Sequence, residues 1–309
     1  MTTKDTSGTT RRRVLQCMGW GSAGILWTVS GGVPRAQALD APKEHLAAAD
    51  FSFVQISDSH IGFTKDPNPT PDATLREALE KIAAMPKRPA FLLHTGDVSH
   101  LSKPSEFEAA SGIMKTAGLE TFYVPGEHDT IGDDGKEFFS RFSPKGAQSG
   151  GWYSFDQNGV HFIGLVNVVG LKDGGLGYLA PEQVQWLEAD TKGLTASTPI
   201  VVFAHMPLWS LYPQWGWGTD GSAEALAALK RFGSVTVLNG HIHQIVQKVE
   251  GNMTFQTARS TAYPQPAAGQ AAGPGPLHVA AEQLRSVIGV RDIDFGGAQP
   301  AIADTALAS

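Results

Sequence analysis

Segments with strand character and segments with helix character alternate along most of this chain of 309 residues, and the alternation strongly restricts its fold. Apolar, β-branched and aromatic runs predict strands at residues 51–57, 90–95, 121–125, 152–155, 160–166, 200–204, 235–238, 245–249, 253–256 and 285–293. Apolar residues at helical spacing predict helices at residues 70–85, 105–117, 181–194 and 222–232. Strands joined through helices lie parallel in one sheet, so the first half predicts βαβ units.

The second half of the chain adds hairpins to this pattern. Asn158-Gly159 lies between two predicted strands, and Glu250-Gly251-Asn252 lies between two others. The expected fold is therefore α/β, a four-layer sandwich of two mixed β-sheets packed face to face and flanked by helices. Residues 264–276 contain only Pro, Gln, Ala and Gly, which predicts a surface loop without secondary structure. We expect the last dozen residues to be poorly ordered.

The amino-terminal segment has the organisation of an export signal. Residues 10–16 resemble a twin-arginine motif, and the apolar run at residues 18–30 is too short and too polar to span a bilayer comfortably. Ala36 and Ala38 are the small residues that a signal peptidase prefers. We therefore expect a signal peptide at residues 1–38 and a single domain at residues 39–309. This predicts a periplasmic or secreted protein that meets the twin-arginine translocase during export and has no stable membrane anchor. The alternative is a basic disordered tail.

The charge of the mature chain restricts its partners and its metal ligands. Cleavage after Ala38 leaves 19 basic and 29 acidic residues, a formal net charge of −10. Such an acidic protein is not expected to bind the backbone of nucleic acids. Cleavage also removes Cys17, the only cysteine, so neither disulfides nor thiolate metal sites are expected. Any metal ion must be held by oxygen and nitrogen ligands.

Five predicted strands end in residues that bind metals or transfer protons. These are Asp58 with His60, Asp97, Glu127 with His128, His205, and His241 with His243. A single histidine or aspartate at such a position is usually a cap or a solvated loop residue, but five such strand ends are not expected from that explanation. If the chain stays extended beyond residue 57, Asp58 and His60 point the same way. The carboxyl ends of strands in open α/β sheets are where ligands bind.

The order and spacing of these residues resemble a known superfamily. The motifs are Asp-x-His at 58–60, Gly-Asp at 96–97, Gly-Glu-His-Asp at 126–129, His-Met-Pro at 205–207 and Gly-His-x-His at 240–243. Over residues 51–256 the chain resembles the calcineurin-like metallophosphoesterases, and within them the single-domain phosphodiesterase-like members, which include cyclic-nucleotide and glycerophosphodiester hydrolases. The resemblance implies an exported dinuclear metal-dependent phosphoesterase, in which a metal-bound hydroxide attacks a small phosphomonoester or phosphodiester substrate.

The resemblance also assigns roles to residues. The first metal ion would be held by Asp58, His60 and His243, and the second by Glu127, His205 and His241, with Asp97 bridging both. His128 would stabilise the transition state or protonate the leaving oxygen, with Asp129 orienting its ring. Mixed carboxylate and imidazole ligands suit two divalent or mixed-valence ions of Fe, Mn or Zn. Two adjacent ions would clamp the phosphoester and lower the pKa of a bridging water.

Glu127 departs from the family pattern, which has a neutral asparagine at that position. A glutamate is longer by one methylene group and brings a negative charge. It could bind the second metal ion more strongly, or it could crowd the position. The alternative function that follows from this departure is a non-catalytic metal-binding or ligand-binding protein with an altered second metal site.

Several other polar and aromatic residues receive structural interpretations. We interpret His100 as a solvated loop residue rather than a further ligand, and His94 and His161 as hydrogen-bonded core residues. A loop near His205 is rich in aromatic residues, which could form a platform for a base or an apolar leaving group. We favour a satellite hydrophobic cluster instead. The aromatic residues of this loop are Trp209, Tyr212, Trp215 and Trp217.

Overall fold

The computed structural model describes residues 25–30, 33–38, 51–296 and 299–308. The chain divides into two units, residues 1–47 and residues 48–309. In the first unit, β1 (Ile25–Ser30) and β2 (Val33–Ala38) form an antiparallel two-stranded sheet. The predicted twin-arginine motif at residues 10–16 lies outside the described residues. Within the described part of the chain, the helices are all too short or too polar to cross a membrane.

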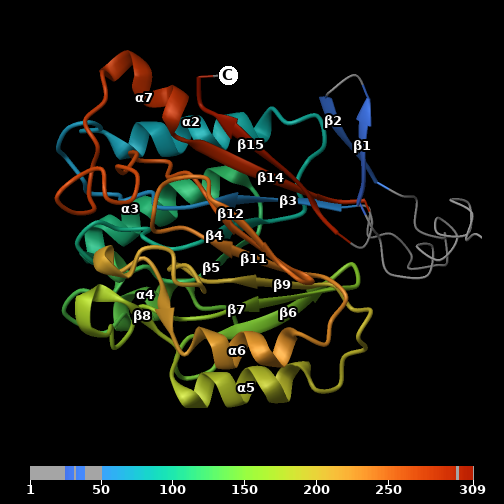
Figure 1. Ribbon diagram of the computed structural model, residues 1–309. Coiled ribbons are helices and arrows are strands. Elements are labelled where there is room, and N and C mark those ends of the chain that lie inside the picture. The colour runs from blue at the N-terminus through green and yellow to red at the C-terminus, as the bar shows by residue number, and fades with distance from the viewer. Residues whose placement is uncertain (1–24, 31–32, 39–50, 297–298, 309) are drawn as a thin grey trace, which may run out of the picture. The chain divides into compact units, whose positions relative to one another are not determined.

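The second unit contains two large sheets (Figure 1). The first has the order β15 (Ala301–Ala306), β14 (Gly289–Phe295), β3 (Phe51–Ile56), β4 (Leu92–His94) and β5 (Thr121–Tyr123). The second has the order β12 (Gln247–Glu250), β13 (Met253–Thr257), β11 (Val235–Asn239), β9 (Ile200–Phe203), β7 (Val160–Gly164) and β6 (Tyr153–Gln157). Strands β3, β4 and β5 are parallel to one another, as are β7, β9, β11 and β13, whereas β6, β12, β14 and β15 pair antiparallel with their neighbours. Both sheets are therefore mixed, as predicted.

Helices cover the outer face of each sheet (Figure 1). Residues of α2 (Pro71–Ala83), α3 (Pro104–Met114) and α4 (Lys136–Phe142) pack on the five-stranded sheet. Residues of α5 (Pro181–Thr191) and α6 (Ser222–Leu229) pack on the six-stranded sheet. Between the two sheets lies a third core that is rich in phenylalanine, where the rings of Phe53 and Phe162 meet edge to face at 5.3 Å. The predicted four-layer arrangement is confirmed.

Strand β3 shows how the sequence produces this layering. Phe51 and Phe53 face the core between the sheets, whereas Val54 and Ile56 face the core beneath the helices. All six residues of the strand are buried. An apolar run without a polar face is therefore what a central strand between two cores requires. The strand stops at Ile56, and the first candidate metal ligand follows two residues later.

Smaller features complete the second unit. Two short strands, β8 (Gly177–Tyr178) and β10 (Thr219–Asp220), pair parallel. The hairpin predicted at Asn158-Gly159 is present, with both residues at positive φ as a tight two-residue turn demands. Residues 264–276 contain neither helix nor strand, as expected. Helix α4 was not predicted, because it is only seven residues long and directly follows the Gly-Asp-Asp-Gly sequence at residues 132–135, which is typical of a loop.

The carboxyl-terminal segment corrects two expectations. Residues 281–287 form helix α7 (Ala281–Val287), so the strand predicted at 285–293 begins only at Gly289. The last dozen residues, expected to be poorly ordered, include β15, which pairs antiparallel with β14. Besides this strand pairing, an ion pair with a buried arginine holds the segment. The fully buried guanidinium of Arg291 contacts both carboxylate oxygens of Asp304 at 2.9 Å and donates to the carbonyl oxygen of Thr257 at 2.9 Å.

Replacing Asp304 by asparagine is expected to lower the free energy of unfolding by about 2–4 kcal/mol, because it leaves the buried Arg291 guanidinium without its counter-charge. The Arg291 side chain is 0 % exposed, so water cannot replace the lost carboxylate fully. Urea unfolding measures the change. Asp294→Asn is the matched control, because it removes the half-exposed pair with Lys87 and should cost less than about 1 kcal/mol. Equal losses in the two variants would show that Arg291 does not depend on Asp304.

Candidate metal centre

The ends of five strands bring the seven predicted metal ligands together. They form two triads, Asp58, His60 and His243 on one side and Glu127, His205 and His241 on the other, and the ligand atoms of each triad lie within 4.8 Å of one another. Asp97 lies between the triads, near His60 and His205. Asp58 and His60 follow β3, Asp97 follows β4, and Glu127 begins a short 3-10 helix after β5. His205 follows β9, and the remaining two histidines follow β11.

The first triad is deeply buried. The Nε2 atoms of His60 and His243 lie 3.3 Å apart, and His243 Nε2 lies 3.3 Å from Asp58 Oδ1. All three residues are at most 2 % exposed. Burial, together with the neighbouring His128 and His243, holds the pKa of His60 well below its ordinary value, so this imidazole is neutral and can offer a lone pair.

Asp97 is placed to serve both triads with one oxygen. Its Oδ1 accepts a hydrogen bond from the backbone N–H of His128 at 3.0 Å. Its Oδ2 lies 3.5 Å from His60 Nε2 in the first triad and 3.4 Å from His205 Nε2 in the second. Because Oδ1 is occupied by the backbone, the orientation of Oδ2 between the two triads is fixed.

The second triad is built around the carboxylate of Glu127. Its Oε2 lies 2.9 Å from His205 Nε2, and its Oε1 lies 3.0 Å from His241 Nδ1. The Glu127 side chain is 25 % exposed, whereas His205 is fully buried. The extra methylene group of glutamate therefore does not push the carboxylate out of the site. Both oxygens face the position that a second cation would take.

Backbone carbonyls set the tautomers of the histidines. The Nδ1–H of His205 donates to the carbonyl oxygen of Thr95 at 2.7 Å, and that of His243 donates to the carbonyl oxygen of Tyr263 at 2.6 Å. A carbonyl oxygen can only accept, so the proton of each neutral ring lies on Nδ1. Each Nε2 atom is then left with its lone pair directed into the site, which is the arrangement that metal-binding histidines require.

The donor set fits metal binding. His205 Nε2, His241 Nδ1 and Glu127 Oε2 are buried and have no hydrogen-bond partner among the described residues, although they lie close together. Burial disfavours a charged His205, yet the carboxylates of Asp97 and Glu127 outweigh burial and raise its pKa well above the ordinary value. The cluster therefore attracts positive charge. A cation between these atoms would supply that charge and give each of them a partner.

The backbone at the site adopts conformations that few residues tolerate. Five ligand residues have a positive φ: Asp58 at 55°, His60 at 42°, Asp97 at 52°, His241 at 69° and His243 at 54°. Left-handed backbone at non-glycine residues costs of order 1 kcal/mol or more each and concentrates at functional sites. The expected convergence of Asp58 and His60 is present, but it arises from left-handed turns after β3 and not from continued extension of the strand.

Two glycines that precede ligand residues allow the strand ends to approach. A Cβ atom on Gly126 would lie 2.0 Å from Asp97 Oδ1, and one on Gly240 would lie 2.0 Å from Ser57 Oγ and 2.7 Å from Asp58 Oδ2. No side chain fits at either position without moving a candidate ligand. The Gly-Glu and Gly-His pairs of the sequence are therefore explained by packing against the carboxylates.

The structure corrects the role expected for Asp129. The ring of His128 is oriented by the carbonyl oxygen of His100, which accepts from Nδ1 at 2.7 Å. The Asp129 carboxylate accepts instead from the backbone N–H groups of Val98, Ser99 and Gly126 at 2.8–3.0 Å. It therefore connects the loop after β4, through Val98 and Ser99, to the loop after β5, through Gly126. Asp129 ends a single 3-10 turn, so its carboxylate is close enough to the N–H of Gly126, the residue that caps the start of this turn. His128 keeps Nε2 free and lies within 4.8 Å of Asp97 and Glu127.

Three other histidines were given structural interpretations, and two of these agree with the structure. His94 Nε2 pairs with Ser59 Oγ at 3.0 Å, and burial lowers the pKa of His94 to about 3. His161 is hydrogen-bonded to two carboxylates, those of Asp156 and Asp190, at 2.8 and 2.9 Å. The third holds only in part, because His100 lies in a loop but is not fully solvated. His100 is partly buried, and its ring stacks on that of His128 at 4.9 Å, with the ring of His60 5.5 Å away. The sequence did contain one signal that could have placed His100 near the site, namely its position three residues after Asp97.

A pocket of 390 Å³ opens onto the metal centre. Its floor contains four of the candidate ligands together with His100 and His128. Its outer wall comes from two segments that the sequence did not connect with the site, around Phe63 and around Tyr263. The wall residues are Phe63, Lys65, Tyr263, Gln265, Pro274, Gly275 and Pro276. Lys65 is the only residue of the lining that carries a permanent positive charge.

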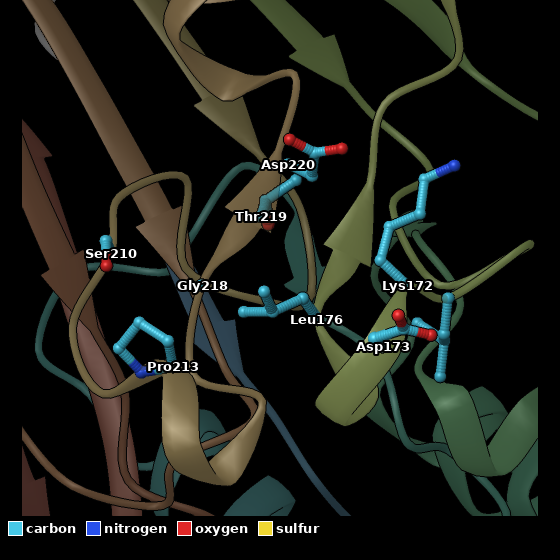
Figure 2. A pocket seen from close by; sticks show the side chains of 9 residues that line it. Lys172, Asp173, Leu176, Ser210, Pro213, Gly218, Thr219 and Asp220 are labelled. Atoms are coloured by element: carbon cyan, nitrogen blue, oxygen red, sulfur yellow. The ribbon is translucent and has the colours of Figure 1, made fainter.

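The aromatic loop does not line this pocket and forms a hydrophobic cluster, the interpretation that we favoured. Trp209 packs on Phe255 at 5.3 Å within the core beneath α5 and α6. Trp217 is 1 % exposed and meets the ring of Trp215 edge to face at 5.1 Å. A second pocket, of 540 Å³, lies beside this loop and is lined by Lys172, Asp173, Leu176 and Pro213 among others (Figure 2). It contains none of the candidate metal ligands.

Comparisons with known proteins agree with this geometry. The sequence profile of the calcineurin-like phosphoesterases matches residues 51–245. A 3',5'-cyclic-nucleotide phosphodiesterase from Nostoc sp. is 28% identical over 221 residues, which cover 69% of this chain and 79% of that protein. A glycerophosphodiester phosphodiesterase from Enterobacter lignolyticus is 23% identical over 199 residues, covering 62% and 69%. A dimetal phosphatase from Danio rerio shares the fold, with a TM-score of 0.54 at 13% identity, covering 82% of this chain and 98% of that one.

Proposed function

The chain belongs to the calcineurin-like phosphoesterase family of metal-dependent phosphoric ester hydrolases, and from this premise we propose that it is a dinuclear enzyme that hydrolyses small phosphodiesters. One observation carries the proposal. Two triads of candidate ligands are joined by Asp97, whose Oδ2 lies within 3.5 Å of a histidine nitrogen in each triad. The two matched phosphodiesterases support a diester substrate.

The residues of the site divide the chemistry between them. Two bound cations would supply an activated water and neutralise the charge that develops on the phosphoryl oxygens. His128 is held by the carbonyl oxygen of His100 with Nε2 free, so it can give a proton to the departing alcohol oxygen. Lys65 at the pocket lining attracts the anionic substrate. Fe, Mn and Zn remain the metals that suit mixed imidazole and carboxylate ligands.

Metal analysis together with a substrate panel tests the proposal. The purified protein should contain, or take up, two ions per chain and should hydrolyse bis-p-nitrophenyl phosphate with Mn, Fe or Zn. Binding of a single ion, or two ions without hydrolysis of either this diester or p-nitrophenyl phosphate, would refute the enzyme proposal. Those results would favour a non-catalytic binding protein on the same fold.

Glu127 supports a diester in preference to a monoester. Three carboxylates face the centre, those of Asp58, Asp97 and Glu127, so two divalent ions leave one net positive charge. A phosphodiester carries one negative charge and balances it, whereas a monoester dianion exceeds it. An asparagine at position 127 would leave two positive charges and suit the dianion.

The Glu127→Asn variant is expected to raise the ratio of monoester to diester kcat/KM about tenfold. Removing one negative charge near the phosphate favours binding of the dianionic monoester more than binding of the monoanionic diester. It should also bind the second ion more weakly, because a neutral amide is a weaker donor than a carboxylate. Metal titrations and the rates for p-nitrophenyl phosphate and its bis ester measure both effects. Glu127→Gln keeps the length and removes the charge, so it separates charge from reach. An unchanged ratio in both variants would show that Glu127 does not select substrate charge.

We also propose export through the twin-arginine pathway, with residues 1–38 removed. This proposal rests on the arginine motif at residues 10–16, the modest apolar run after it and the small residues Ala36 and Ala38. That pathway carries folded proteins, which suits a domain that receives its metal ions before export. The amino-terminal sequence of the protein recovered from the periplasm tests it, and a mature chain that begins at Leu39 is expected.

A further inference from the structure

The loop at residues 264–277 is closed on itself at the edge of the metal centre. The N–H of Leu277 donates to the carbonyl oxygen of Pro264 at 2.8 Å, so the two ends of the loop lie together. The N–H of Gly275 donates to Gln265 Oε1 at 3.2 Å. Such a loop with paired ends is an Ω-loop, a form that often carries function. We call residues 264–277 the proline loop.

The proline loop is attached directly to the segment that carries two candidate metal ligands. Gln265 Nε2 donates to the carbonyl oxygen of His241 at 2.9 Å, and Gln244 Nε2 donates to that of Pro266 at 2.8 Å. Just before the loop, the carbonyl oxygen of Tyr263 accepts from the Nδ1–H of His243. The position of the loop is therefore set by the same backbone that sets the histidines. Its far end is held by the contact between His278 and Asp66.

The wall that this loop presents to the pocket is largely apolar. Pro274 and Pro276 line the pocket with exposed side chains. Phe63 and Tyr263 also line it, but each is only 3 % exposed, and their rings pack against each other with centroids 4.6 Å apart. The proline loop contains no charged residue. Gln265 is the residue of this loop whose side-chain amide lines the pocket, and both the oxygen and the nitrogen of that amide already make hydrogen bonds within the protein. The wall thus offers the two proline rings and few polar groups, beside a floor that contains candidate metal ligands.

We propose that this wall is the subsite for one ester group of the substrate, and that this group is a flat, uncharged ring. The inference rests on the proposed function for the placing of the phosphate on the metal centre. The exposed rings of Pro274 and Pro276 can contact a flat group over a larger apolar area than a methyl group can cover. Lys65, the charged residue of the lining, is left for the anionic phosphate and is not needed for the ring.

Diphenyl phosphate and dimethyl phosphate test the subsite, because both are monoanionic diesters and they differ only in the ester groups. Calorimetric titration of the Mn-loaded protein should show diphenyl phosphate bound about tenfold more tightly, as expected from partial burial of one ring. Equal affinity for the two anions would overturn the subsite, even if the protein hydrolyses bis-p-nitrophenyl phosphate. A tenfold preference in a protein that hydrolyses nothing would support the subsite while refuting the enzyme.

The double variant Pro274→Ser, Pro276→Ser assigns the preference to the proline loop. Both side chains are exposed, so the substitutions should leave the fold intact. The ratio of the two affinities is expected to fall to about two, because the ring faces are removed and the metal centre is not touched. Pro213→Ser is the matched control, an exposed proline that lines the other pocket and should leave the ratio unchanged (Figure 2). A full preference retained by the double variant would overturn the assignment to this loop.

Discussion

The Asp97→Ala variant is expected to lose at least one metal ion per chain and about 10³-fold or more in kcat/KM. One oxygen of this carboxylate lies within 3.5 Å of histidine nitrogens in both triads, so its removal takes a ligand from both positions at once. Metal ions supply several kcal/mol of charge stabilisation in such reactions, which corresponds to a loss of this size. Metal analysis of the purified variant and its rate on bis-p-nitrophenyl phosphate measure the two effects.

Asp97 also accepts a hydrogen bond from the backbone of His128, so the alanine variant could lose order there. Asp97→Asn keeps an oxygen for that hydrogen bond and removes only the charge, and it should show the same loss of metal. Asp173→Ala is the control for removing an acidic residue elsewhere, since Asp173 lines the second pocket. Two ions retained together with full activity in the alanine variant would refute the dinuclear centre.

The sequence predicted the position of the candidate site well because of how α/β sheets are built. Parallel strands separated by helices place their carboxyl ends at one edge, so residues such as Asp58 and His205 meet there although they are far apart along the chain. The glycines before Asp97, Glu127 and His241 were visible as motif positions. The structure was needed to show why they are glycines: a Cβ on Gly96 would meet the His205 ring, and a Cβ on Gly126 or Gly240 would meet a ligand carboxylate.

Local backbone geometry was beyond what a sequence pattern can give. Period-two alternation led to an extended arrangement of Asp58 and His60, but both residues adopt left-handed conformations, which are uncommon outside glycine even though Asp and His enter them more often than most residues. The role of Asp129 depended on which backbone N–H groups lay nearby, and those of Val98 and Ser99 belong to another loop. A motif states which residues are present and leaves open which atoms they bind.

Long-range contacts account for the remaining differences. The local sequence of β15 predicts a disordered tail, because neither its pairing with β14 nor the contact of Asp304 with the buried Arg291 can be predicted from either segment alone. The proline loop was correctly expected to lack secondary structure. Its position at the metal centre follows from Gln265 and Gln244, whose hydrogen bonds join segments about 20 residues apart.

The His128→Ala variant is expected to keep both metal ions and to lose about 10²–10⁴-fold in kcat for diesters with an alkyl leaving group, the usual contribution of a general acid. The geometry supports this assignment. The ring is fixed by the carbonyl oxygen of His100, which accepts from Nδ1, and by stacking on the His100 ring at 4.9 Å, and one ring nitrogen of His128 lies within 4.8 Å of carboxylate oxygens of Asp97 and Glu127. Neither triad needs His128, so metal content should not change.

Two substrates act as controls for each other in this variant. p-Nitrophenolate leaves without protonation, so the loss for a p-nitrophenyl ester should be much smaller than the loss for an alkyl ester, because only the alkoxide needs a proton from the protein. A structural defect would slow both substrates equally. If the two losses are the same while both metal ions remain bound, His128 is not the acid, and it acts on the phosphoryl oxygens, whose charge develops with either leaving group.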